Sequence, residues 1–132
     1  MIYLDANIFL YPHSGKGPKS DACIEILRKL SENKIDAGTS TLTWDEVHYA
    51  LRKMLGKEKA IEQSKLFLET PNLRFIRVDE EIINKAQEMI EKYGLNPRDA
   101  IHAVTAIINK ADGIITDDSD FDRVKEIKRI KI

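Results

Sequence analysis

The stretch Gly113-Ile114-Ile115-Thr116-Asp117-Asp118 decides the fold class, because it is a short apolar strand that runs directly into acids. A similar stretch, Met1-Ile2-Tyr3-Leu4-Asp5, opens the chain. Short apolar runs of this kind, alternating with helices, are typical of strands buried in a parallel sheet. Ligands bind such sheets beyond the carboxyl ends of the strands. If the two strands are neighbours, we therefore expect acids from opposite ends of the chain to meet at one edge.

The sequence between these strands alternates between strand-like and helical patterns. Further strands are expected at residues 37–41, 73–78 and 127–132, and a polar loop at residues 12–18. The apolar spacing predicts helices at residues 20–32, 43–55, 58–69, 80–93 and 97–108. This order predicts an α/β fold in one domain, residues 1–132: a three-layer sandwich with a parallel sheet between helices.

The composition excludes several classes of protein. The net charge is −1, so any contact with nucleic acid must come from local basic patches. The single cysteine, Cys23, allows no disulfide within the chain and no cysteine-based zinc site, which favours the reducing cytoplasm. We find no signal peptide and no apolar run near the roughly 20 residues of a membrane span. The basic candidates for RNA contact, each more often a merely solvated side chain, are Lys16, Lys19, Arg52, Lys53, Lys57 and Arg98.

The acid at the end of the first strand has two interpretations. Asp5 could form an Asx turn or cap the next helix, which is a purely structural role. Its place at the carboxyl end of a parallel strand instead favours a ligand site. Asn7 could orient Asp5, contact a substrate oxygen, or be the helix cap itself.

Two acids near helix starts are also open to a capping interpretation. Glu46 ends Thr43-Trp44-Asp45-Glu46, which matches the capping box, but it also borders the apolar side of its helix. Asp99 follows Asn96 and Pro97, which suit a helix start. That helix is apolar nearly all round, so the buried charge needs a partner, and a metal ion would serve best. His102 shares the face of Asp99, where packing or a hydrogen bond is favoured over a metal-ligand role.

The acidic stretch Thr116–Asp122 is the strongest local signal. A cap at Ser119, with Asp122 reaching back to it, would explain only two of its residues. Two carboxylates about 4 Å apart repel by roughly 4 kcal/mol at an effective dielectric of about 20, so converging acids need a cation or protons. Oxygen ligands without cysteine suit Mg²⁺ or Mn²⁺. Strand alternation points Thr116 and Asp118 to one face and Asp117 to the other.

Four motifs in this order resemble the acidic motifs of PIN-domain ribonucleases over essentially the whole chain. They are Leu4-Asp5-Ala6-Asn7, Glu46 at the end of Ser40–Glu46, Asp99 in Arg98–Ala103, and Thr116-Asp117-Asp118-Ser119-Asp120-Phe121. The compact size is similar to that of VapC-type toxins from prokaryotic toxin–antitoxin pairs. The resemblance implies a sheet in the order 3-2-1-4-5, a divalent-metal site and cleavage of RNA. It also implies a homodimer and an antitoxin partner.

We therefore predict a divalent-metal-dependent endoribonuclease. The predicted catalytic residues are Asp5, Glu46, Asp99 and Asp118, and the predicted metal ligands are Asp5, Asp99, Asp118 and Asp120. Asn7, Thr116 and Arg98 are predicted to assist by contacting substrate or the ligand carboxylates. The alternatives are a PIN nuclease in ribosomal-RNA maturation, a catalytically silent RNA- or protein-binding module, and a phosphatase with Asp5 as nucleophile.

Overall fold

The computed structural model describes residues 1–132 and is built on one sheet of five strands. The strands are β1 (Ile2–Leu4), β2 (Ala37–Ser40), β3 (Leu73–Ile76), β4 (Gly113–Ile115) and β5 (Arg129–Ile130). Their order is β3-β2-β1-β4-β5, and every neighbouring pair is parallel. The expected parallel sheet and its order are therefore confirmed, and β1 lies at its centre beside β4.

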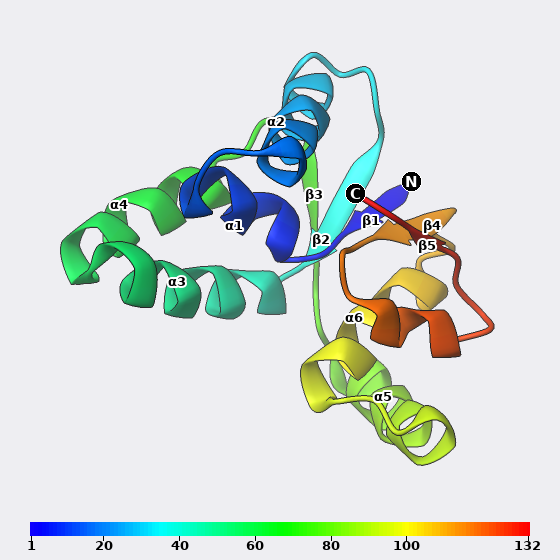
Figure 1. The fold of residues 1–132 in the computed structure, drawn as a ribbon. Helices are drawn as coiled ribbons and strands as arrows, with labels where there is room; N and C mark the ends of the chain where they lie inside the picture. The colour runs from blue at the N-terminus through cyan, green and yellow to red at the C-terminus, as the bar shows by residue number, and fades with distance from the viewer.

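Helices cover both faces of this sheet. They are α1 (Asn7–Ser14), α2 (Pro18–Ser31), α3 (Leu42–Leu55), α4 (Lys57–Leu68), α5 (Glu80–Tyr93), α6 (Pro97–Ile108) and the 3₁₀ helix η1 (Ser119–Arg123). Helices α1 to α4 lie on one side of the sheet, and α5 and α6 lie on the other (Figure 1). The three-layer sandwich predicted from the sequence is thus confirmed.

The central strand divides the core into two clusters. Tyr3 and Leu4 are both fully buried, and as neighbours in a strand they point to opposite faces. Tyr3 joins the cluster formed with α5, α6 and η1, whereas Leu4 joins the cluster formed with α1 to α4. Cys23 is buried in the second cluster, as expected for a core residue. Each face of β1 therefore holds one helical layer in place.

Several element boundaries differ from those expected. Helix α1 runs through Pro12 to Ser14, where a loop was expected, although a proline inside a helix removes a backbone hydrogen bond and disfavours the helix. Helix α2 begins at Pro18 because proline suits the first helical position. Strand β3 ends at Ile76, earlier than expected, and β5 covers only Arg129–Ile130 of the expected residues 127–132. The cap at Asp79 is confirmed, since its side chain accepts a hydrogen bond from the backbone N–H of Ile82.

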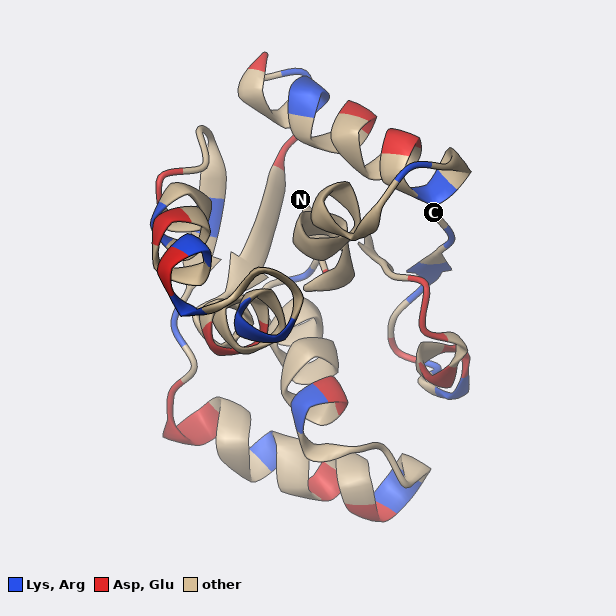
Figure 2. Cartoon of the chain, turned by 60° about the vertical axis from the view of Figure 1, so that its left-hand side comes forward, with Lys and Arg blue, Asp and Glu red and all other residues tan.

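Charge is distributed evenly over the molecule. Basic and acidic residues alternate along the outer helices, as Figure 2 shows, in keeping with a net charge of −1. No helix has both the length and the apolar character needed to cross a membrane. Any attraction for a charged ligand therefore has to come from a local arrangement of side chains.

Candidate functional site

Acids from distant parts of the chain meet at the carboxyl edge of the sheet. Strands β1 and β4 pair in register, with Leu4 opposite Ile115, so the chain leaves both strands at the same level. Asp5 follows β1 directly, and Asp118 follows β4 by three residues. A cavity of about 290 Å³ opens there, lined by Asp5, Ala6, Asn7, Leu10, Glu46, Tyr49, Ala50, Arg98, Asp99 and Asp118. The structure thus brings together all four acids that the sequence predicts to be catalytic.

Hydrogen bonds fix the first of these acids. Asp5 is only 6% exposed, and its Oδ1 accepts a bond from the backbone N–H of Ala6 at 2.7 Å. Its Oδ2 accepts a bond from the hydroxyl of Thr116, also at 2.7 Å. The Thr116 hydroxyl in turn accepts a bond from the backbone N–H of Asp118 at 3.0 Å. One buried hydroxyl therefore sets the position of Asp5 relative to the turn that carries Asp118.

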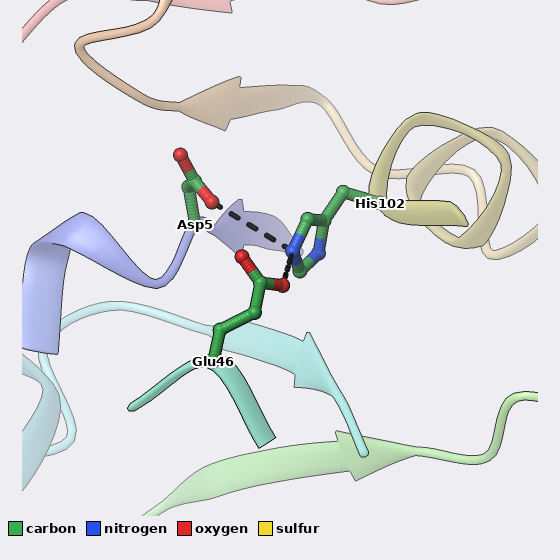
Figure 3. Close-up of side chains that lie close together, drawn as sticks. All are labelled: Asp5, Glu46 and His102. Atoms are coloured by element: carbon green, nitrogen blue, oxygen red, sulfur yellow. Dashed lines mark hydrogen bonds and ion pairs between the residues drawn. The ribbon is translucent and has the colours of Figure 1, made fainter. Parts of the chain in front are cut away.

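A second group of contacts joins the central strand to α3 and α6. The hydroxyl of Tyr3 lies 2.5 Å from Nδ1 of His102 and accepts a hydrogen bond from the backbone N–H of Ser40. Nε2 of His102 contacts Oε1 of Glu46 and lies 3.8 Å from Oδ1 of Asp5 (Figure 3). Both ring nitrogens of this fully buried histidine are thus occupied by protein groups. His102 is therefore a hydrogen-bonding residue and has no lone pair free for a metal ion.

Burial and neighbouring charges shift the acid–base properties of the site. Burial raises the pKa of Asp5 above its usual value, although the neighbouring His102 and Thr116 act in the opposite direction. Burial also disfavours the charged form of His102, but Tyr3, Glu46 and Asp5 outweigh this effect and raise its pKa well above the usual value. Burial raises the pKa of Asp99 to about 6, with further contributions from Asp118 and Asp5. The carboxylates thus destabilise one another's charged forms.

The structure excludes the capping-box interpretation of Glu46. Helix α3 begins at Leu42, one residue earlier than expected, with Thr41 at the N-cap position. The hydroxyl of Thr43, the expected cap, lies 2.6 Å from that of Thr39. The Glu46 carboxylate contacts His102 in place of the helix start.

Asp99 lies in the first turn of α6, as expected. The side chain of Asn96 occupies the N-cap position without making a capping hydrogen bond. The Asp99 side chain is left to face the cavity with no hydrogen bond from the protein. Asn7 also lines the cavity and is not the cap of α1, because Ala6 holds that position.

The three acids of the last motif point in different directions. Asp117 accepts hydrogen bonds from the hydroxyl of Tyr11 at 2.7 Å and from Lys19 at 2.6 Å, outside the cavity. Asp118 lines the cavity, and its Oδ1 accepts a bond from the backbone N–H of Asp120. Asp118, and not Ser119, is therefore the N-cap of η1, which excludes the alternative of a cap at Ser119. The separation of Asp117 from Asp118 follows the alternation of side chains along an extended chain.

The outer acids provide a suitable set of ligands for a divalent cation. One carboxylate oxygen from each of Asp99, Asp118 and Asp120 lies within 4.8 Å of the other two. Asp120 keeps one oxygen in an ion pair with Arg123 at 2.8 Å, which leaves the other for a ligand. Oxygen donors with no cysteine match the preferences of Mg²⁺ and Mn²⁺. The residues present therefore fit a hard divalent ion.

The mutual repulsion of the site's carboxylates predicts that Asp99→Asn stabilises the metal-free protein. The folded protein binds the Asp99 proton more tightly than the unfolded chain does, since its pKa rises from the ordinary 3.8 to about 6. Wild-type stability should therefore fall as pH rises through that interval, and the variant should lack this loss. Thermal unfolding in a chelator at pH 5 and pH 8 measures the effect. Asp21→Asn removes a first-turn acid of α2 and should instead cost a few tenths of a kcal/mol. A lower melting temperature for Asp99→Asn at pH 8 would favour the capping interpretation.

Sequence reasoning missed two aromatic residues of the site. The first is Tyr3, whose hydroxyl bonds to His102. A tyrosine in a strand expected to be buried could have indicated that its hydroxyl needs a partner. Tyr49 lines the cavity, and it lies one turn beyond Glu46 on α3. Arg98, predicted to assist, lies at the cavity wall and pairs with Asp45 at 3.3 Å.

Comparisons with known proteins agree with this geometry. The PIN domain family matches residues 2–127. The chain is 25% identical to ribonuclease VapC2 of Methanocaldococcus jannaschii, over 99% of this chain and 93% of that protein. It superposes on the VapBC2 structure from Rickettsia felis, bound to a promoter DNA fragment, with a TM-score of 0.75 at 26% identity, covering 99% of this chain and 98% of that one. VapC20 of Mycobacterium tuberculosis shares the fold, with a TM-score of 0.76 at 16% identity over 95% of each chain. The protein therefore belongs to the PIN-domain family.

Proposed function

We propose that this protein is a divalent-metal-dependent endoribonuclease and the toxin of a type II toxin–antitoxin pair. The observation that carries the proposal is the convergence of Asp5, Glu46, Asp99 and Asp118 on one cavity at the carboxyl edge of the sheet. The similarity to a ribonuclease named VapC2 supports the choice of RNA as substrate. We also propose that it acts in the cytoplasm, where cellular RNA is available as substrate.

The acids have distinct roles in the proposed reaction. Asp99, Asp118 and Asp120 would hold Mg²⁺ or Mn²⁺, and Asp5 would join them from the same cavity. The ion would supply activation of a water molecule and neutralise charge on the phosphate. Glu46 receives a hydrogen bond from His102 on Oε1, and its Oε2 makes no hydrogen bond within the protein. That oxygen is free to accept a proton as water attacks phosphorus and the P–O bond to the leaving nucleotide breaks. Thr116 keeps Asp5 oriented throughout.

The geometry disfavours the alternative of an aspartyl nucleophile. A nucleophilic Asp5 would have to present an oxygen to the phosphorus atom. Asp5 is 6% exposed, and each of its oxygens already accepts a hydrogen bond. Attack by water, guided by the surrounding carboxylates, fits the site better.

Partner proteins follow from the same proposal. The Rickettsia felis relative was solved as a VapBC2 assembly, which supports an antitoxin partner for this chain. We also propose a homodimer. Large apolar side chains such as Ile61, Leu66 and Leu68 are about half exposed and could pack against a second copy of the chain. Light scattering of the purified protein at micromolar concentration tests this state.

We expect the purified protein to cleave unstructured RNA in the presence of Mg²⁺ or Mn²⁺. Cleavage should stop in a chelator, and Asp5→Asn should abolish it because the variant loses a buried ligand charge. Gel analysis of end-labelled RNA measures both effects, with Asp36→Asn as a control acid at the other end of β2. Asp36 pairs with Arg74 on the surface, so this variant should cleave normally. Cleavage that persists in a chelator would contradict the proposed chemistry.

A further inference from the structure

One aromatic side chain at the mouth of the acidic cavity has no structural task. Tyr49 lies one turn after Glu46 on α3, so both side chains share a face of that helix. It lines the cavity together with Asp5, Asp99 and Asp118. The side chain is 53% exposed. A tyrosine this exposed contributes little to the core, but its position lets it contact whatever enters the cavity.

Two cations accompany this ring. Nζ of Lys53, one turn further along α3, lies 4.4 Å from the ring centroid. Arg98 lines the same cavity from α6. A hydrogen bond from Lys53 and its charge lower the pKa of Tyr49, and the charge of Arg98 acts in the same direction. An aromatic face bordered by two cations thus adjoins the acids.

This combination matches the needs of a single RNA strand. The acids themselves repel phosphates, so affinity for RNA has to come from groups beside the acid cluster. Proteins that bind single strands use aromatic rings on which bases stack and cations that contact the backbone. Bases of a duplex are already stacked and offer no face to a ring, so such a ring selects unpaired nucleotides.

Resting on the proposed nuclease function, we propose that Tyr49, Lys53 and Arg98 form a subsite for one unpaired nucleotide next to the scissile phosphate. The Tyr49 ring stacks on the base, and Lys53 and Arg98 contact the flanking phosphates. The cavity wall that Tyr49 shares with Glu46 sets the distance between the stacked base and the reacting phosphorus. The subsite makes the protein a nuclease of single-stranded or loop RNA and disfavours duplex RNA.

A binding experiment isolates the stacking contribution. Fluorescence anisotropy with a labelled unstructured oligoribonucleotide is measured in an Asp118→Asn background, in which cleavage does not interfere. Tyr49→Ala should weaken binding by roughly 10-fold or more, in the range of base–aromatic stacking. Tyr49→Phe keeps the ring and should stay within about threefold of the parent. An oligonucleotide of the same length with abasic positions should bind the parent and Tyr49→Ala equally.

The matched control is another exposed aromatic residue of the same helix. Trp44 is 40% exposed, but its ring packs against His48 and it does not line the cavity. Trp44→Ala should leave RNA binding unchanged. An equal loss for Trp44→Ala and Tyr49→Ala, or no loss for Tyr49→Ala, would overturn the subsite. Tyr49-dependent binding of an acidic peptide without any effect on RNA would overturn it in favour of a protein ligand.

Cleavage assays separate this proposal from the one on which it rests. If the wild type cleaves RNA and Tyr49→Ala binds and cleaves it equally well, the subsite fails and the nuclease function stands. If the wild type cleaves no RNA under any metal condition, the nuclease function fails, whatever Tyr49 contributes to binding.

Discussion

Asp118→Asn is expected to lower RNA cleavage by about 100-fold or more, the scale seen when a key electrostatic group is removed from an active site. Asp118 lines the cavity beside Asp5, Glu46 and Asp99, and its Oδ1 also caps η1. Asparagine keeps an oxygen for that cap, so the fold should persist while the charge at the cavity is lost. Initial rates of cleavage at saturating Mg²⁺ measure the effect.

Two neighbouring acids serve as matched controls for Asp118. Asp117→Asn should change cleavage little, because Asp117 is held outside the cavity by Tyr11 and Lys19. Asp120→Asn should show an intermediate loss, because one of its oxygens is committed to Arg123. If Asp117→Asn alone abolished metal binding, the assignment of Asp118 as principal ligand would be wrong. Isothermal titration with Mn²⁺ distinguishes loss of binding from loss of catalysis.

His102→Leu is expected to lower the free energy of unfolding by about 3 kcal/mol, since it removes the hydrogen bonds that the imidazole makes to the Tyr3 hydroxyl and to the Glu46 carboxylate. The buried Tyr3 hydroxyl would keep only the hydrogen bond that it accepts from the backbone N–H of Ser40. The Glu46 charge would also face Asp5 without the intervening imidazole. Denaturant unfolding in a chelator measures the change, and cleavage should fall as well because Glu46 loses its orientation.

A second substitution tests the cause of this loss. Tyr3→Phe removes the hydroxyl, so adding it to His102→Leu should cost less than the sum of the two single losses. Additive losses would mean that the variant acts through packing alone. A loss below about 1 kcal/mol for His102→Leu would show that these hydrogen bonds are little more favourable than the bonds that the same groups make to water.

The sequence was sufficient to predict which strand ends carry the acids. Asp5 and Asp118 follow short apolar strands, and in a parallel sheet those ends meet at one edge. Strand alternation also separated Asp118 from Asp117, in agreement with their positions in the structure. These inferences rest on periodicity and topology, which are properties of the chain itself.

The contacts that orient the acids could not be predicted from the sequence. The start of α3 depends on the hydroxyl of Thr43 bonding to Thr39 across the β2–α3 turn, which removes it as a helix cap. The meeting of Tyr3 with His102 depends on how α6 packs against β1. The Tyr3–His102 contact is decided by tertiary packing, and the Thr39–Thr43 contact depends on the conformation of the turn between β2 and α3. Local patterns therefore identified the acids but not the groups that orient them.

The pairing of β1 with β4 also bears on when the enzyme becomes active during its synthesis. Thr116 and Asp5 are hydrogen-bonded across 111 positions of sequence, so the ribosome makes Thr116 long after Asp5. A growing chain carries Asp5 and Glu46 early, but the central strand has no β4 beside it and the acid cluster has no Asp118. Contacts this distant in sequence form late in folding. For the proposed toxin, the delay means that a translating cell meets the activity only after the residues up to Asp118 have been made, which leaves that interval for an antitoxin to accumulate.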